Sequence, residues 1–402
     1  MATGSSTLPQ LHDVAGIRLG SAMAGIKKID HRDTQLIEIA PGSSVSAVFT
    51  RNAFCAAPVQ LAKSHLAQGV PRYLLINTGN ANAGTGLDGL AVAQRSCAEL
   101  AQLCGVQEFE VLPFSTGVIG EHLPAEKLIA ALPAVLDGLS ASGWSLAATT
   151  ILTTDTRPKA ASRQFLLEGK TVTITGICKG SGMIKPNMAT MLGYVASDAK
   201  ISQQLLDDIL RTAVDSSFNR ITVDSDTSTN DAVVLMATGA SQVEVDSDNR
   251  DQFAAELNQL FVELAQSIIR DGEGASKFVE VTVAGGKTRD EALAAAYAVA
   301  ESPLVKTALA ASDPNWGRIL AAIGRAGIKE LDVDKISIAL NGVSIVENGG
   351  RAVTYTEEAG QVAMASEDIV IAIELGRGEI VERVWTCDLT YEYVRINAEY
   401  RT

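Results

Sequence analysis

Thr190 stands where an internal threonine could become a reactive N-terminus. It follows a glycine-containing loop at residues 179–189 and precedes a β-prone run at residues 191–195. If the loop holds the Thr190 hydroxyl against the Ala189 carbonyl, an N-to-O acyl shift followed by hydrolysis cuts the chain between these two residues. The pattern therefore predicts a self-cleavage that exposes a threonine nucleophile.

The α-amine released by this cleavage would serve as the base for its own hydroxyl group. An unperturbed α-amine has a pKa of about 7.7 to 8.0, and a threonine paired with its N-terminal amine is a known activated nucleophile. No histidine is needed. The four histidines lie in the first third of the chain, with no carboxylate or nucleophile at a telling spacing: His12, His31, His65 and His122. A Ser-His-Asp triad, which can be assembled from any chain order, is the weaker alternative.

Glycine, proline and asparagine before a strand are by themselves typical of a surface turn. However, residues 179–192 resemble the cleavage and nucleophile motif of the ornithine acetyltransferase family, the glutamate N-acetyltransferases of arginine biosynthesis. In that family the bond before the threonine is cut autocatalytically. Segments 48–59, 77–86, 115–120 and 313–318 match the same family in the same order. The resemblance therefore spans nearly the whole chain, from about residue 16 to residue 402.

The resemblance implies roles for particular side chains. Thr190 is the expected nucleophile, and the hydroxyl of Thr116 with the backbone amide of Gly117 is the expected oxyanion hole. The expected substrate contacts are Thr156, Lys179, Thr190, Glu273, Asn397 and Thr402. The charges suit an N-acetylated diamino acid, because Lys179 can hold its carboxylate and Glu273 its terminal ammonium.

A substrate contact at the last residue requires a docked C-terminal tail, since chain ends tend to fray. The anchors that the pattern offers for this tail are Tyr391, Tyr393, Ile396 and Tyr400.

The function implied by the resemblance is ping-pong acetyl transfer from N2-acetylornithine to glutamate, with no cofactor and no metal. Some members of the family also use acetyl-CoA, and no residue of this sequence decides that point. Two alternatives remain open. One is a related N-terminal-nucleophile amidohydrolase or aminopeptidase, in which water is the acceptor. The other is an uncleaved binding protein.

Composition excludes several classes of partner. The net charge of −14 disfavours nucleic acid and anionic membrane surfaces. The longest plain apolar stretch, residues 292–300, is far shorter than the roughly 20 residues that span a bilayer, and the first residues lack the pattern of a signal peptide. Five scattered cysteines without a Cys-x-x-Cys pair favour reduced thiols. We therefore expect a soluble, cytoplasmic protein that contacts neither nucleic acid nor membrane.

Two motifs imitate other sites. Residues 84–89 spell G-x-G-x-x-G, but the glycines come too long after the expected strand for a dinucleotide-binding turn, and no acidic residue ends a following strand. Residues 224–231 begin like a calcium loop, yet Thr229 replaces the required glycine and Leu235 the bidentate glutamate. We expect the first to be a compact loop near the site and the second a hydrogen-bonded turn.

Helix and strand patterns alternate along the chain. The helices are expected at residues 88–103, 124–139, 202–215, 251–269 and 288–309. The strands are expected at residues 45–50, 72–77, 109–114, 163–167, 171–177, 191–195, 278–283, 335–340, 369–375 and 380–393. The resemblance implies a layered α/β/β/α sandwich. Cleavage would give an α chain (1–189) with the oxyanion hole and a β chain (190–402) with the nucleophile, associated as a dimer of αβ pairs.

Overall fold

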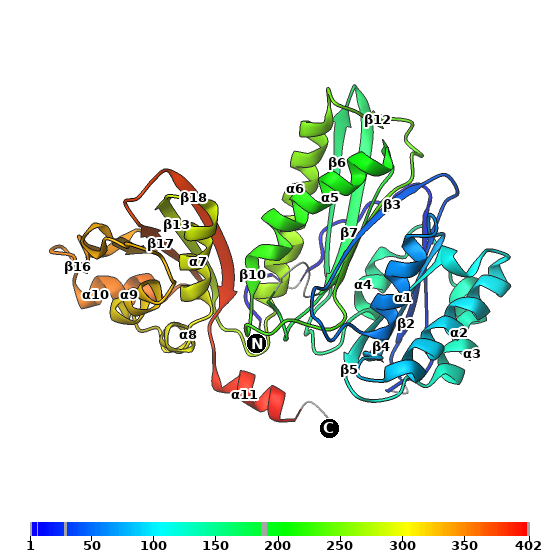
Figure 1. The fold of residues 1–402 in the computed structure, drawn as a ribbon, viewed down its shortest axis with the longest axis horizontal. Helices are drawn as coiled ribbons and strands as arrows, with labels where there is room; N and C mark the ends of the chain where they lie inside the picture. The colour runs from blue at the N-terminus through cyan, green and yellow to red at the C-terminus, as the bar shows by residue number, and fades with distance from the viewer. Residues whose placement is uncertain (1, 6, 28–29, 186–190, 400–402) are drawn as a thin grey trace.

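The computed structural model describes residues 2–5, 7–27, 30–185 and 191–399. Ala189, Thr190, Tyr400 and Thr402 lie outside the described residues. Two lobes stand side by side in Figure 1. The larger lobe holds most of the chain up to about residue 270, and the smaller lobe is built mainly from the residues that follow, shown in yellow to red.

The larger lobe contains two main sheets. The first has the strand order β1-β2-β4-β5, and the second has the order β3-β11-β8-β7-β6. Their strands are β1 (Ile17–Ala22), β2 (Thr34–Ile39), β3 (Ser44–Phe49), β4 (Tyr73–Asn80), β5 (Val111–Val118), β6 (Lys159–Leu167), β7 (Lys170–Lys179), β8 (Leu192–Ser197) and β11 (Ala232–Ala237). A short ladder joins β9 (Lys200–Ile201) to β12 (Glu244–Val245).

Helices cover the outer faces of both sheets. The helices of this lobe are α1 (Ala57–Leu66), α2 (Gly86–Cys104), α3 (Ala125–Asp137), α4 (Trp144–Thr150), α5 (Gln203–Ser216) and α6 (Arg250–Arg270). Helices α1 to α3 pack on the first sheet, and α5 and α6 pack on the second.

Alternation along single strands explains this layering, because successive side chains of a strand point to opposite faces. In β4, Leu74 and Ile76 join the cluster between the two sheets together with Tyr194, whereas Leu75 joins the cluster beneath the helices. In β11, Val234 likewise faces the first sheet. Both sheets are buried on both faces, and the expected α/β/β/α sandwich is confirmed for this lobe.

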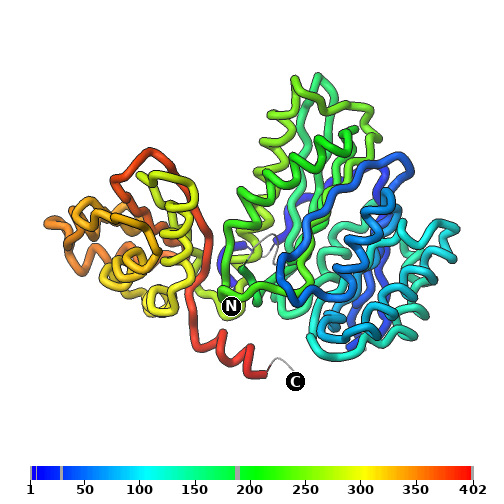
Figure 2. The backbone as a smooth tube through the Cα atoms, viewed as in Figure 1, coloured from blue at the N-terminus to red at the C-terminus, as the bar shows by residue number. Residues whose placement is uncertain are grey.

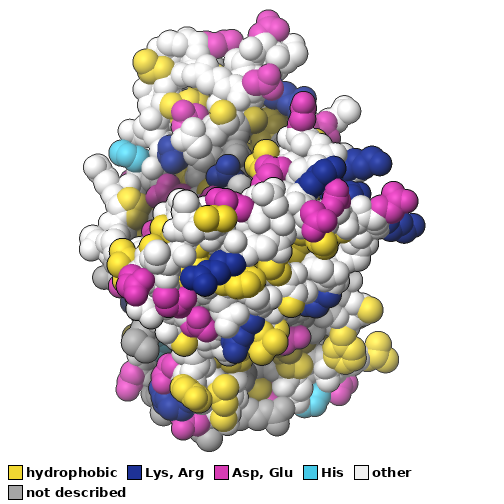
Figure 3. Space-filling model, turned by 90° about the vertical axis from the view of Figure 1, so that its left-hand side faces the viewer, with side chains coloured by type: hydrophobic (Ala, Val, Ile, Leu, Met, Phe, Trp, Pro, Cys, Tyr) yellow, Lys and Arg dark blue, Asp and Glu magenta, His cyan; other side chains and the backbone are white. Residues whose placement is uncertain are grey.

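The smaller lobe is a third sheet with helices on it, which the sequence patterns did not separate from the sandwich. Its strand order is β10-β18-β13-β17-β14-β15-β16. The strands are β10 (Ile221–Thr222), β13 (Phe278–Gly286), β14 (Ser337–Leu340), β15 (Val343–Glu347), β16 (Gly350–Arg351), β17 (Asp368–Glu374) and β18 (Ile380–Cys387). The helices are α7 (Arg289–Ala300), α8 (Pro303–Ala310), α9 (Trp316–Gly324) and α10 (Glu357–Met364). The face of the molecule that this lobe presents mixes acidic, basic and hydrophobic side chains (Figure 3).

After β18 the chain leaves the smaller lobe and forms helix α11 (Tyr391–Ala398), which extends below the larger lobe (Figure 2). The expected strand at 380–393 is therefore wrong beyond Cys387. The expected helix at 288–309 is also wrong in extent, because it is two helices. Pro303 has no N–H to continue α7 and instead opens α8, where the Ser302 hydroxyl accepts from the Val305 N–H at 3.4 Å.

The other four expected helices are confirmed as α2, α3, α5 and α6, and the expected strands are found with shifted ends. Helices α1, α4, α9, α10 and α11 were not predicted, nor were strands β1, β2 and β11 and the short strands β9, β10, β12, β15 and β16. Within the described residues, no helix combines the length and the apolar character needed to cross a bilayer.

Candidate functional site

A cavity of about 240 Å³ lies where strands of both main sheets end. Its wall combines the ends of β5 and β7 with the starts of β8 and β11, and α11 reaches it from the other lobe. The described lining residues are Ala81, Thr116, Gly117, Val118, Ile119, Thr153, Thr154, Lys179, Gly180, Gly182, Met183, Ile184, Met191, Leu192, Ser228, Thr229, Asn230, Asp231, Glu273 and Asn397. Met191, which directly follows Thr190 in the chain, is therefore on the cavity wall.

Thr116 and Gly117 end strand β5 at this cavity. Gly117 has a φ of +135°, and a Cβ there would lie 2.3 Å from the carbonyl carbon of Gly79, so no other residue fits. The β4–β5 register is irregular at Gly79 and Asn80, opposite these residues. Such irregularities re-aim a strand at functional sites, and here the turn brings both expected oxyanion donors to the cavity.

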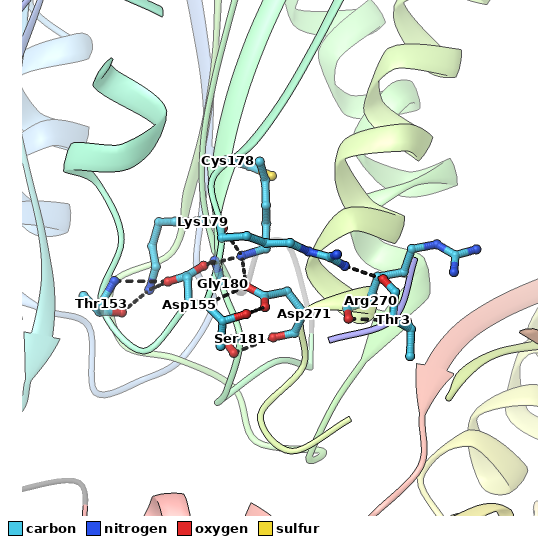
Figure 4. A network of polar contacts seen from close by, with 12 residues as sticks. Thr3, Thr153, Asp155, Cys178, Lys179, Gly180, Ser181, Arg270 and Asp271 are labelled. Atoms are coloured by element: carbon cyan, nitrogen blue, oxygen red, sulfur yellow. Dashed lines mark hydrogen bonds and ion pairs between the residues drawn. The ribbon is translucent and has the colours of Figure 1, made fainter. Parts of the chain in front are cut away.

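Lys179 ends strand β7 beside them. Its Nζ donates to the Thr153 hydroxyl at 2.8 Å and to the Thr116 hydroxyl at 3.3 Å, and lies 3.8 Å from Asp155 Oδ2. Figure 4 shows Thr153, Asp155 and Lys179 pointing toward one another. A hydroxyl has one proton to donate. Because the Thr116 oxygen accepts from Lys179, its proton is directed away from that ammonium group.

A buried ionic network supports this end of β7. Lys159 Nζ lies 2.6 Å from Asp155 Oδ1 and 2.6 Å from Asp271 Oδ2, and all three side chains are almost fully buried. Burial alone raises the pKa of the Asp155 carboxyl, but the ammonium groups of Lys159 and Lys179 outweigh it and hold that pKa below its usual range. Asp155 also accepts from the Gly180 N–H at 2.7 Å. The network thus anchors the first residue of the loop that leads to Ala189.

Thr156 belongs to this network and not to the described cavity wall. Its N–H donates to Asp271 Oδ2 at 3.0 Å, and its hydroxyl donates to Asp271 Oδ1. Sequence reasoning placed Thr156 at the substrate and missed the network altogether. The signal it overlooked is a lysine four residues after Asp155, although the third member, Asp271, could not have been paired with them by spacing.

Glu273 also lines the cavity. It is only 7% exposed, and its Oε2 accepts from Asn397 Nδ2 at 2.8 Å. A Cβ on Gly182 would lie 2.4 Å from the Glu273 carboxyl carbon, so the glycine makes room for this side chain. The structure therefore brings Glu273 and Asn397 together.

The tail that carries Asn397 is held by polar contacts. The Thr390 hydroxyl donates to the Gly274 carbonyl at 2.7 Å, and the Tyr393 hydroxyl donates to Asp224 Oδ2 at 3.3 Å. Tyr391, expected as an anchor, is 97% exposed, and that expectation is wrong. Its ring faces solvent because α11 buries none of its described residues.

The segment that imitates a calcium loop is part of the site. Asp224 accepts from the N–H groups of Met183 at 2.6 Å and Ile184 at 2.9 Å. Asn230 donates to the carbonyls of Ala81 at 2.6 Å and Ser115 at 3.0 Å. The segment thus fixes loops of the cavity wall. No group of three or more His, Cys, Asp or Glu side chains that could hold a metal ion occurs within the described residues.

Asp231 is the residue on the wall that sequence reasoning missed. It is 4% exposed, and within the described part of the chain its Oδ2 has no hydrogen-bond partner. Burial raises the pKa of the Asp231 carboxyl well above its usual range, although Ser228 and the Lys179 ammonium oppose the shift. A perturbed carboxyl in a cavity is a candidate functional group.

A second cavity of about 480 Å³ adjoins the first. The two share Gly117, Val118, Thr153 and Thr154 as lining residues. The second is further lined by Lys27, His31, Asp33, Thr78, Gly79, Thr149, Leu152, Asp155 and Ile396. The strand end at Gly117 and Val118 thus borders both cavities.

Known proteins resemble this chain over its full length. The profile of the ArgJ family matches residues 18–402. The arginine biosynthesis bifunctional protein ArgJ of Pseudomonas syringae pv. tomato is 58% identical over 100% of both chains. The protein of the same name from Methylococcus capsulatus is 54% identical over 98% of this chain and 97% of its own. A crystal structure of ArgJ from Bacillus halodurans is 38% identical, covers 51% of this chain and 97% of that chain, and aligns with a TM-score of 0.49.

Proposed function

The chain belongs to the ArgJ family, and from that membership we propose that it is the acyltransferase of arginine biosynthesis that moves an acetyl group from N2-acetylornithine to glutamate. The observation that carries the proposal is the convergence on one cavity of Thr116, Gly117, Lys179, Glu273 and Met191. Consecutive Cα atoms are about 3.8 Å apart, so residue 190 is joined to the wall of that cavity by one peptide bond.

The reaction proceeds through an acetyl-enzyme. The Thr190 hydroxyl, its proton taken by its own α-amine, attacks the acetyl carbonyl of N2-acetylornithine. The Thr116 hydroxyl and the Gly117 N–H stabilise the oxyanion. The amide bond breaks, ornithine leaves with the proton, and the acetyl group remains as an ester on Thr190. The amine of glutamate then attacks this ester and regenerates the free threonine.

Charges of the cavity suit both amino acids. Lys179 supplies a cation for the α-carboxylate that N2-acetylornithine and glutamate share. Glu273, buried and contacted by Asn397, supplies an anion for the side-chain ammonium of the ornithine group. Thr156, bonded to Asp271 through its N–H, acts on substrate through the network, and Thr402 completes the contact from the tail.

Self-cleavage between Ala189 and Thr190 unmasks the nucleophile. The resulting α chain (1–189) contributes β3, β6 and β7 to the second sheet, and the β chain (190–402) contributes β8 and β11. Strand β8 pairs along β7, with Leu192 opposite Lys179. Because the two chains share a sheet, they remain one folded unit, and we expect two such αβ pairs to form a dimer.

A second activity is favoured by the second cavity and by the bifunctional relatives. We propose that acetyl-CoA also donates acetyl to Thr190, so that the enzyme makes N-acetylglutamate directly. The donor enters from the cavity that reaches Gly117 on its other side, where Lys27 and His31 suit phosphate groups.

Intact mass and N-terminal sequencing under denaturing conditions test the proposed nucleophile. The expected result is two chains, the second beginning Thr-Met-Leu, and a single chain for Thr190→Ala. Thr190→Ser, which keeps a hydroxyl, serves as the matched control. A Thr190→Ala protein still cut at this bond would overturn the proposal.

Product analysis then identifies the acceptor. With labelled N2-acetylornithine and glutamate, the label should appear in N-acetylglutamate with parallel-line ping-pong kinetics. Release of free acetate at the same rate with and without glutamate would instead identify an amidohydrolase. An intact chain that binds N2-acetylornithine without turnover would identify a binding protein.

A further inference from the structure

Self-cleavage poses a problem of proton transfer that the mature enzyme does not have. In the uncut chain the nitrogen of Thr190 belongs to an amide, whose lone pair is delocalised, so it cannot act as a base. The threonine hydroxyl must nevertheless lose its proton to attack the Ala189 carbonyl. Some other group at the cavity must therefore accept that proton, and this question rests on the proposed cleavage before Thr190.

Asp231 has the position required of such a group. It immediately precedes strand β11, which runs parallel to β8 with Ala232 opposite Leu192. The Ala232 N–H donates to the Met191 carbonyl at 2.9 Å. Neighbouring strands lie about 4.8 Å apart, so Asp231 stands beside the residue that directly follows Thr190. Its side chain is on the cavity wall.

The hydrogen bonds of Asp231 leave a proton acceptor available. Its Oδ2 is buried and, within the described residues, accepts no hydrogen bond. Unpaired buried oxygens are rare and costly, because the group has lost its water without gaining a partner. An oxygen of this kind on the wall of a cavity indicates a ligand or a reacting group that it serves.

The other ionisable groups of the described cavity wall are less suited to accept the hydroxyl proton. Glu273 already accepts from Asn397 at 2.8 Å. Lys179 donates to two hydroxyls and lies 3.8 Å from Asp155 Oδ2, so its contacts are those of a hydrogen-bond donor. The described lining includes no histidine. Among the described wall residues, Asp231 is thus the carboxylate with a buried oxygen, Oδ2, that accepts no hydrogen bond.

We propose that Asp231 is the general base of self-cleavage. Its carboxylate takes the Thr190 hydroxyl proton while the hydroxyl oxygen bonds to the Ala189 carbonyl carbon. The C–N bond then breaks, and Asp231 returns the proton to the departing nitrogen, which becomes the α-amine. Water next attacks the Ala189 ester and gives a proton to Asp231. When the C–O bond breaks, that proton restores the Thr190 hydroxyl and Ala189 keeps the new carboxyl group.

Burial supports this role because it makes the Asp231 carboxylate more basic. It raises the pKa of the Asp231 carboxyl well above its usual range, against the opposing effects of Ser228 and Lys179. A base works best when its pKa approaches the operating pH. Since the ionised form is required, the cleavage rate should rise with pH through this elevated pKa. Lys179 and Glu273 are the other charged side chains among the described residues that line the cavity.

The test follows the chain state of full-length variants by denaturing mass spectrometry over time. Asp231→Asn, which keeps shape but loses basicity, should cleave at least about 100-fold more slowly than wild type. Asp231→Ala should also remain uncut, and added formate should restore its cleavage, because formate fits the vacated space. Asp231→Asn should show no such rescue.

Asp198→Asn is the matched control. Asp198 is also a buried aspartate of this sheet, accepting from the Thr173 N–H at 2.9 Å, but it follows the opposite end of β8. The Asp198→Asn protein should be cleaved at the wild-type rate. A folded Asp231→Asn protein, with a melting temperature near that of wild type, that cleaves normally would overturn the assignment, as would an Asp231→Ala protein that formate leaves intact.

Thr190→Ala, measured in parallel, separates this inference from the proposed function. If Thr190→Ala is cut at the same bond, the proposed nucleophile itself is wrong. If Thr190→Ala stays intact and Asp231→Asn is cut normally, only the role of Asp231 fails.

Discussion

At the scale of single residues, the proposed oxyanion hole at Thr116 and Gly117 depends on one hydrogen bond to Thr116. The Lys179 ammonium donates to the Thr116 hydroxyl oxygen at 3.3 Å. The proton of the Thr116 hydroxyl therefore remains available for another oxygen. Gly117 provides the neighbouring N–H in a conformation, φ +135°, that only glycine adopts easily. The two donors are therefore oriented before substrate arrives, which is the condition for efficient stabilisation of a developing charge.

Thr116→Val should lower kcat per cleaved chain by about 100- to 1000-fold, the effect of losing one oxyanion donor. The KM should change little, because the donor acts mainly on the transition state. Steady-state kinetics on the fully cut fraction measure both values. Thr116→Ser keeps the hydroxyl and should retain most activity, whereas wild-type kcat in Thr116→Val would contradict the assignment.

At the scale of elements, helix α11 is a short helix that contributes Asn397 to the cavity wall. It buries no residue among those described, yet it carries Asn397 to Glu273. Polar contacts at its start hold it, because Thr390 both caps the helix and bonds the Gly274 carbonyl. Substrate affinity should therefore be separable here from the stability of the whole fold.

Thr390→Val should raise the KM for N2-acetylornithine by up to roughly 30-fold, since the cap and the bond to Gly274 are each worth about 1 kcal/mol. The melting temperature should stay close to that of wild type. Kinetics and calorimetry on the same preparation test both parts. Thr390→Ser is the control that retains the hydroxyl, and a large loss of melting temperature in Thr390→Val would show that α11 is structural.

At the scale of the molecule, the buried ionic network joins the two proposed chains. Asp155 and Lys159 precede the proposed cleavage site and Asp271 follows it, so the contact of Lys159 with Asp271 at 2.6 Å bridges the two proposed chains. The shared second sheet does the same through its backbone ladder. The proposed cut would therefore free an amine without releasing either chain.

Lys159→Met should destabilise the protein by about 3–5 kcal/mol, because it leaves two buried carboxylates without their cation. Urea unfolding at neutral pH measures the loss. Lys170→Met, at an exposed position on the same hairpin, should change the free energy of unfolding by less than about 0.5 kcal/mol. A Lys159→Met protein as stable as this control would show that the network contributes little.

The same network predicts that its contribution to the free energy of unfolding is lost at acidic pH. Burial raises the pKa of Asp155, but Lys159 and Lys179 lower it below the usual range. Its folded-state pKa is thus below the unfolded value of about 3.9, so its contribution is complete above that pH and is lost as the pH falls below it. The stability gap between wild type and Lys159→Met should narrow below about pH 4 in urea titrations. If the difference in stability between wild type and Lys159→Met did not depend on pH, Asp155 could not be the source of that difference.

Sequence alone determined what depends on neighbours in the chain. Alternating apolar residues predicted β4 and β7, helical spacing predicted α6, and the motif around Thr190 with the turn at Thr116 predicted the chemistry. One wrong prediction could have been avoided from the sequence. Pro303 indicates that the helix expected at 288–309 is divided in two.

Tertiary structure alone decided what depends on segments far apart. Lys179 meets Thr116 across 63 positions and Lys159 meets Asp271 across 112. The unpaired Oδ2 of Asp231 is buried only in the folded chain, where Asp231 lines the cavity. No periodic pattern in the sequence predicts such contacts, because they follow from the path of the chain and from the burial of both sheet faces. The sequence thus specified the reacting groups, and the packing of distant strands specified their partners.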